Sequence, residues 1–380
     1  MRIKYFLFTT CIALVHPGCN PGNQNADLQE DTIMAEVAED LSGSLLLRDY
    51  RPKSIYRIPR TQIEKARFPV IDMHSHVYAS DRAAIDRWVE TMNQLGIEKV
   101  IVMTQAHGSR FDSILALYSA YPDRFDVWCT FDYTGYDKPG FGPAAVDELE
   151  RCTAMGAKGV GELGDKGRGL FYNRQAQAWG MHADDPRMDP LFDKCAELGL
   201  PVNIHMAEPM WMYEPMDSTN DGMMNALRWK VEMEEGMLDH DGLMQALRNT
   251  LERHPETTFI ACHYANCCYD LSIVADMLDR YPNLYLDISA RFFWVAAIPR
   301  HAAAFFSKYQ DRLLYGTDMG TDPRMYRFTF RILETADEHF YGFEYGMDNY
   351  HFPLYGLDLD EAVLEKLYRT NALRIYHTAR

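Results

Sequence analysis

Five side chains of the kinds that bind metal ions each close a short apolar run of the chain. His74 and His76 end the first run, and His205, His263 and Asp318 each end a later one. The runs are strand-like in composition. Imidazole and carboxylate groups bind divalent cations, and a bound cation makes water acidic enough to attack at neutral pH. The pattern therefore predicts a hydrolytic metal centre.

His74 and His76 stand two residues apart, so on an extended strand both imidazoles project to the same side and can bind one ion. A ligand set of histidine and carboxylate suits zinc, and also manganese, iron or cobalt. We therefore expect a divalent metal, with zinc named first, as one or two ions.

The elements that would position these residues alternate between strand and helix. We predict strands at Pro69 to Met73, Lys99 to Thr104, Phe125 to Phe131, Ala157 to Leu163, Leu200 to His205, Thr257 to His263, Leu284 to Ser289 and Arg312 to Asp318. Helical patterns lie between them at Ala83 to Leu95, Ala144 to Met155, Leu191 to Leu198 and Gly242 to Arg253. Eight such units predict an α/β fold of the (β/α)8 TIM barrel type, with an open doubly wound sheet as the alternative.

Three connections are longer than a barrel needs: Gly164 to Pro186, Met206 to about Gly236, and Met319 to about Asp358. All three follow strands, so these long loops belong on the C-terminal face, where barrels carry their active sites. We expect them to form a pocket for a small-molecule substrate.

The Asp72-x-His74-x-His76 opening, His205, His263 and Gly316-Thr317-Asp318 resemble the amidohydrolase superfamily, and more narrowly its amidohydrolase 2 family. The segments Asn283 to Arg291 and Leu367 to Tyr376 support the resemblance, which covers about residues 68 to 378. It implies a metal-dependent enzyme, and that branch includes decarboxylases and lactonases as well as hydrolases.

Glu162 ends the fourth predicted strand, where relatives carry a carboxylated lysine, a bridging glutamate or no ligand. It is a candidate bridge between two metals, and the alternatives are an acceptor for a ligand histidine or a substrate contact. The resemblance gives Asp318 the proton transfer, and it leaves His263 as a second ligand or a catalytic acid. Arg291 and Glu208 are candidate substrate-binding residues, although Arg291 could equally pair with Asp287.

The beginning of the chain has the order of an export signal: basic residues, a short apolar run and then Gly18-Cys19. We interpret residues 1–19 as a lipoprotein-type signal peptide, residues 20–67 as a solvated tether, and residues 68–380 as the barrel. The protein is then expected to be periplasmic or anchored at the outer membrane, touching a membrane only through its lipid.

The net charge of −17 argues against nucleic acid as a partner. The cysteines lack the spacing of a disulfide framework, and adjacent Cys267 and Cys268 are better explained as buried small residues than as ligands. The oligomeric state stays open.

Three functions follow in order of preference. The first is a metal-dependent hydrolase of an amide, lactone or ester bond, acting through metal-activated water. The second is a metal-dependent decarboxylase of the same family, and the third is a noncatalytic binding lipoprotein.

Overall fold

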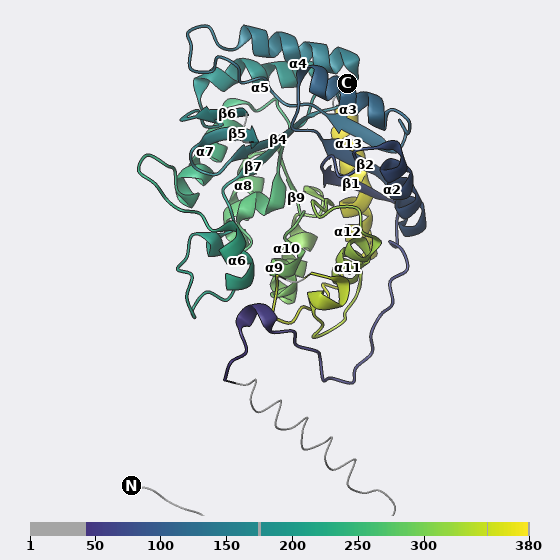
Figure 1. Cartoon of the computed structure of the whole chain (residues 1–380). Coiled ribbons are helices and arrows are strands. Elements are labelled where there is room, and N and C mark those ends of the chain that lie inside the picture. The colour runs from purple at the N-terminus through teal and green to yellow at the C-terminus, as the bar shows by residue number, and fades with distance from the viewer. Residues whose placement is uncertain (1–42, 174–175, 348, 379–380) are drawn as a thin grey trace, which may run out of the picture. The chain divides into compact units, whose positions relative to one another are not determined.

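The computed structural model describes residues 43–173, 176–347 and 349–378 (Figure 1). The predicted signal peptide and residues 20–42 of the predicted tether lie outside these residues. Residues 43–50 belong to a separate small unit with one short helical turn, η1 (Leu47–Asp49). The second unit begins at Arg51 and contains every strand. In the described part of the chain, no helix is both long and apolar enough to cross a bilayer.

Eight parallel strands form the centre of this unit, one at each predicted position. They are β1 (Val70–Ser75), β2 (Ile97–Met103), β3 (Phe125–Trp128), β4 (Val160–Asp165), β7 (Val202–Met206), β8 (Phe259–Ala261), β9 (Leu284–Asp287) and β10 (Leu313–Leu314). They are assigned to two sheets, with orders β1-β2-β3 and β10-β9-β8-β7-β4-β5-β6. The eight strand predictions are therefore confirmed: β1, β4 and β7 end one or two residues later than predicted, and the other five end earlier.

Backbone hydrogen bonds join the two sheets at both of their junctions. Gly161 N donates to Cys129 O at 2.9 Å between β3 and β4, and Met73 N donates to Tyr315 O at 2.9 Å between β1 and the end of β10. Each of the eight strands therefore has a neighbour on either side. This arrangement confirms the barrel and rules out the open doubly wound sheet, whose edge strands would lie apart.

Helices cover the outside of the strands (Figure 1). They are α2 (Arg82–Leu95), α3 (Gly108–Tyr118), α4 (Pro143–Met155), α5 (Asp189–Leu198), α6 (Met223–Trp229), α7 (His240–Arg253), α8 (Leu271–Arg280), α9 (Phe292–Ala296), α10 (Pro299–Lys308), α11 (Pro323–Glu334), α12 (Glu361–Glu365) and α13 (Asn371–Thr378). The four helices predicted from periodicity are all present, and each begins one or two residues earlier than predicted.

Helix α2 shows why these segments are helical. The Asp81 carboxylate accepts from Ala84 N at 2.8 Å and caps the first turn. The helix ends at Gly96, whose φ of 79° suits glycine. Its buried side chains recur at helical spacing, so one face packs against the strands: Ile85, Trp88, Val89, Met92 and Leu95.

A separate apolar cluster fills the inside of the barrel. It contains Ile71, Met73, Ile101, Met103, Trp128, Ile260 and Leu314 from the strands, together with Ala372 and Ile375 from α13. Because α13 contributes to this cluster, it closes the end of the barrel opposite the strands' carboxyl ends. The open end is left for the polar residues that follow the strands.

The three long connections are partly regular. The first contains a hairpin of β5 (Gly169–Asn173) and β6 (Ala176–Trp179), which extends the sheet beside β4. The second contains the 3-10 turn η3 (Met210–Met212) and α6. The third contains α11, which we did not predict, and η5 (Gly342–Tyr345).

The segment just before the barrel differs from the predicted tether. Thr61 donates its backbone N–H and its hydroxyl to the Asp337 carboxylate, at 2.9 and 2.7 Å. Arg67 N donates to Glu334 at 3.1 Å, and the Tyr56 and His339 rings lie 4.7 Å apart. Residues 51–67 are thus held on the barrel unit rather than free in solvent, because long-range partners that no local pattern reveals satisfy their polar groups.

The interior cluster gives a stability prediction. Ile260→Ala removes a fully buried side chain from the barrel, so we expect it to lower the free energy of unfolding by about 2–5 kcal/mol in urea titration. The matched variant Ile55→Ala, at a side chain that is 89% exposed, should stay within about 0.5 kcal/mol of the wild type. Equal losses in both would show that Ile260 does not pack as described.

Candidate metal centre

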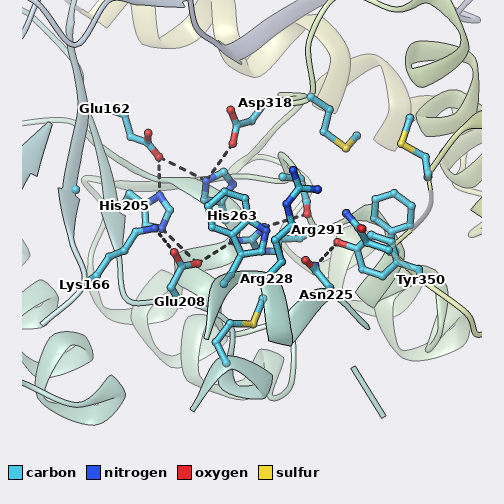
Figure 2. A pocket seen from close by; sticks show the side chains of 18 of the residues that line it. Glu162, Lys166, His205, Glu208, Asn225, Arg228, His263, Arg291, Asp318 and Tyr350 are labelled. Atoms are coloured by element: carbon cyan, nitrogen blue, oxygen red, sulfur yellow. Dashed lines mark hydrogen bonds and ion pairs between the residues drawn. The ribbon is translucent and has the colours of Figure 1, made fainter. Parts of the chain in front are cut away.

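All six predicted ligands lie at one end of the barrel. His74 is on β1, Glu162 on β4 and His205 on β7, while His76, His263 and Asp318 follow strands β1, β8 and β10. In Figure 2, Glu162 and Asp318 lie above the labelled side chains of His205 and His263. Their nitrogen and oxygen atoms form overlapping groups within 4.8 Å of one another. The predicted convergence is therefore present, while the role of each residue as a ligand stays a prediction.

Three of the histidines direct Nε2 at the cluster and use Nδ1 for another partner. His76 Nδ1 donates to Met103 O at 3.1 Å, and His263 Nδ1 donates to Ser289 O at 2.9 Å. A carbonyl oxygen only accepts, so the proton of each neutral ring is on Nδ1 and the lone pair is on Nε2. Both Nε2 atoms face the Asp318 carboxylate, at 3.3 and 3.7 Å. This is the tautomer that a metal ligand requires.

His74 is oriented in the same way, but the partner of its Nδ1 is a carboxylate and not a backbone carbonyl. Its Nδ1 lies 2.9 Å from Asp287 Oδ2, and its buried Nε2 has no hydrogen-bond partner among the described residues. That Nε2 lies 3.9 Å from both Glu162 and Asp318. An orphaned buried nitrogen aimed at two carboxylates fits a site that holds a cation.

His205 is turned differently. Its Nδ1 contacts Glu162 Oε1 at 2.6 Å, and its buried Nε2 has no hydrogen bond and lies 4.0 Å from Glu208. Glu162 therefore already serves as the acceptor for one ligand candidate, which was one of the alternatives from the sequence. Glu208, the predicted substrate residue, lies on the opposite side of the same ring.

Glu162 faces all four histidines of the cluster. Its Oε2 is 3.5 Å from His76 Nε2, and its Oε1 is 3.5 Å from His263 Nε2 and close to His205. Burial opposes the charge of this carboxylate, but His205 and its neighbours hold the pKa of Glu162 well below its ordinary value. Its Oε2 faces His76 while its Oε1 faces His74, His205 and His263, so both oxygens of this ionised carboxylate are directed at candidate ligands, as a bridging ligand requires.

Asp318 is held in place from both sides. Its backbone N–H donates to His74 O at 2.9 Å, and the Tyr78 hydroxyl donates to Oδ1 at 2.9 Å. Burial opposes its charge, yet His74 and His76 keep the pKa of Asp318 far below its ordinary value. The carboxylate is therefore ionised and able to accept a proton.

Asp287 contacts His74 in the site, a role that was not predicted from the sequence. It is fully buried and accepts from Asn203 Nδ2 and His263 N at 3.1 Å each, besides its contact with His74. Burial raises its pKa, but the charge and hydrogen bond of His74 lower it further, to about 2. Its position at the end of β9, equivalent to that of the other candidates, was a signal that could have found it.

The suggested pairing of Arg291 with Asp287 is wrong. Arg291 donates through Nε and Nη2 to Asn266 Oδ1, at 2.9 and 2.6 Å, and lies 3.8 Å from Glu208. Burial first, and then the Arg291 charge, lower the pKa of His263 to about 4. His263 is therefore neutral at neutral pH, as a ligand must be.

A pocket of about 660 Å³ opens beside the cluster (Figure 2). Glu162, His205, His263 and Asp318 line it, as do the predicted substrate residues Glu208 and Arg291. All three long connections contribute to its wall, as predicted: Lys166, Phe171, Met212, Asn225, Arg228, Trp229, Met319, Gly346, Met347, Asn349 and Tyr350. Lys166, which donates to Glu208, and Arg228 were not among the sequence candidates.

Two other sequence candidates lie away from the cluster. Cys267 and Cys268 are buried and free, in agreement with a packing role. The cysteine that reaches the site is Cys262, whose Sγ lies 3.4 Å from Glu162 Oε1.

The contact between His74 and Asp287 predicts a loss of metal affinity in Asp287→Asn. The carboxylate fixes the ring and makes its Nε2 a better donor, so the amide should weaken zinc binding by about 10- to 100-fold. Competition with a chromophoric chelator measures this. Asp276→Asn on α8, at a carboxylate that pairs with Arg280 and does not belong to the cluster, is the matched control, and unchanged affinity in Asp287→Asn would contradict the assignment.

Metal uptake should release protons. Burial lowers the pKa of His74, but Asp287 and Asp318 outweigh it and raise the pKa to about 9, so the metal-free protein holds this proton at neutral pH. A ligand histidine must lose it, so zinc affinity should rise between about pH 6 and about pH 8. Calorimetry in buffers of different ionisation enthalpy measures the release. Zinc binding without proton release would count against His74 as a ligand.

Comparisons with known proteins agree with this picture. A family model described as amidohydrolase matches residues 71–378. An uncharacterized TIM-barrel protein from Bordetella bronchiseptica is similar at 18% identity and TM-score 0.52, over 82% of this chain and 99% of that one. The 2,6-dihydroxybenzoate decarboxylase from Rhizobium is similar at 17% identity and TM-score 0.50, again over 82% and 99%. At these identities the structures show the fold alone, and no curated protein sequence matches. The chain belongs to the amidohydrolase family.

Proposed function

We propose that this protein is a metal-dependent hydrolase that cleaves an amide, lactone or ester bond of a small molecule. The observation that carries the proposal is the placement of Glu162 and Asp318, each of which faces both His76 and His263. These carboxylates and the histidines around them would hold one or two divalent cations, and Glu162 would be the shared ligand if two were bound. When bound, such cations acidify water and polarise a carbonyl group.

The residues of this chain supply the proton transfers. Asp318 is ionised, so it accepts the proton of the attacking water as the oxygen bonds to the substrate carbonyl carbon. As the bond to the leaving group breaks, Asp318 returns that proton to the leaving oxygen or nitrogen. The Tyr78 hydroxyl, 2.9 Å from Oδ1, orients the carboxylate throughout.

A decarboxylase is the second candidate. Arg291 lines the pocket near neutral His263, and a guanidinium there can hold a substrate carboxylate. The similarity in fold to a 2,6-dihydroxybenzoate decarboxylase supports considering this activity. The two candidates share most of the site, so only the products separate them.

The test of the metal-dependent reaction is His74→Ala combined with His76→Ala. We expect this variant to lose bound metal and any turnover found in a screen of amides, lactones and esters, because two donors to the site are gone. His107→Ala combined with His301→Ala removes two histidines outside the cluster and should keep both. Full activity in the variant that lacks His74 and His76 would contradict the proposal.

Isotope labelling separates hydrolysis from decarboxylation. In water labelled with heavy oxygen, hydrolysis places one solvent oxygen in the product acid. Decarboxylation instead releases carbon dioxide from an intact carboxylic acid substrate and adds no solvent oxygen to the organic product. We expect label in the product, and carbon dioxide release without it would replace the hydrolase by the decarboxylase.

A further inference from the structure

The wall of the pocket that faces the metal ligands carries an unusual concentration of positive charge. Lys166 and Arg228 extend from the first and second long connections, and Arg291 follows β9. Figure 2 shows Lys166, Glu208 and Arg228 on the side of the pocket opposite Glu162 and Asp318. A cationic wall is not expected from the composition, because the chain as a whole has a net charge of −17.

Glu208 is the carboxylate of this wall, and it is shared. It accepts from Lys166, lies 3.8 Å from Arg291 Nη2 and lies 4.0 Å from His205 Nε2. Burial opposes its charge, but Lys166, His205 and Arg291 lower its pKa, so it is ionised. The single carboxylate of Glu208 is thus shared by Lys166 and Arg291, and the charge of Arg228 comes in addition.

Arg228 has no carboxylate partner among the described residues. It lies on the exposed side of α6, with its guanidinium 5.8 Å from the centre of the Trp229 ring. Exposed arginines without an ion pair occur elsewhere among the described residues, as Arg300 does on α10, and Arg228 differs from them because it lines the pocket. Arg228 therefore presents all its donors to the pocket and to solvent, and a planar guanidinium binds oxygen anions through two parallel hydrogen bonds.

Apolar side chains line the pocket as well, among them Phe171, Met212, Trp229, Phe293 and Met347, beside the polar Gln105, Asn225 and Asn349. A second cavity, of about 520 Å³, adjoins the first and shares Lys166, Phe171, Glu208, Arg228 and Trp229 with it. Lys166 and Arg228 thus lie where the two cavities meet. Glu208 contacts both Lys166 and His205, so a group bound between Lys166 and Arg228 lies beside Glu208 and not at the metal ligands themselves.

We propose that the substrate carries an anionic oxygen group, a carboxylate or a sulfonate-like group, at the end remote from the metal centre, and that Arg228 and Lys166 bind it. The apolar wall accommodates the ring or alkyl body between the two ends. This inference deepens the proposed function, because it names the substrate class of the same site. Arg228 and Lys166 are then specificity-determining residues that take no part in the proton transfers.

The experiment measures binding, and it needs no turnover. Zinc-loaded protein is titrated by calorimetry with benzoate, terephthalate and para-sulfobenzoate, which share one ring and differ in the second anionic group. We expect at least one of the two doubly charged probes to bind about tenfold or more tightly than benzoate. Whichever of terephthalate and para-sulfobenzoate binds more tightly shows whether the site prefers a carboxylate or a sulfonate.

Arg228→Gln should remove this preference and leave the affinity for benzoate and the metal content unchanged. Arg300→Gln, at an exposed arginine of α10, is the matched control and should keep the preference, while Lys166→Gln should reduce it. Equal affinity for all probes, absence of binding, or a preference that survives in Arg228→Gln would overturn the inference. Because metal content is measured on the same samples, loss of the anion preference with metal retained is distinguishable from failure of the metal centre.

Discussion

The burial of charge at one end of the barrel is the constraint on which the site depends. Three carboxylates, Glu162, Asp287 and Asp318, are grouped with four histidines, and all of these residues except His76 and Asp318 are buried. Removing an ion from water costs several kcal/mol unless another charge or a set of hydrogen bonds compensates. Each charge of the cluster is therefore stable only while the others hold their places, and the proposed cation would add positive charge beside the carboxylates.

The backbone around the cluster is correspondingly unusual. Gln105, Ala207, His263, Ala290 and Asp318 each have φ between 50° and 63°, and each stands within four residues of a strand end. In η4 (Cys262–Asn266), four consecutive residues from His263 onward have positive φ. None is glycine, so each position costs about 1–3 kcal/mol. The strained positions include His263 and Asp318 of the cluster, and Asn266, whose side chain accepts hydrogen bonds from Arg291.

Close approach of strands is a second requirement of the site. A Cβ added at Gly316 would lie 2.7 Å from His74 Cβ. Strands β1 and β10 therefore meet beside the metal cluster only because one of them has no side chain there. The glycine of Gly316-Thr317-Asp318 serves the same packing that places His74 near Asp318.

The sequence predicts the barrel and the converging residues well, because both rest on short-range patterns. A strand is visible as an apolar run, and parallel strands share one face for whatever follows them. The choice of Asp287 as the partner of His74 was not predictable, since the two lie 213 positions apart. Lys166 and Arg228 were missed for a related reason: they lie on long connections, whose conformation depends on the rest of the fold. The hydrogen bonds between Thr61 and Asp337 were not predicted either, because they join residues that lie far apart in the sequence.

The most direct test of the account is the metal content of each chain, measured by elemental analysis of protein purified without chelators. Wild type and Glu162→Gln are compared, because the amide keeps the size of the side chain and loses the charge that would join two cations. The account predicts two ions in the wild type and one in the variant. One ion in both proteins, or two in both, would contradict the bridging role of Glu162.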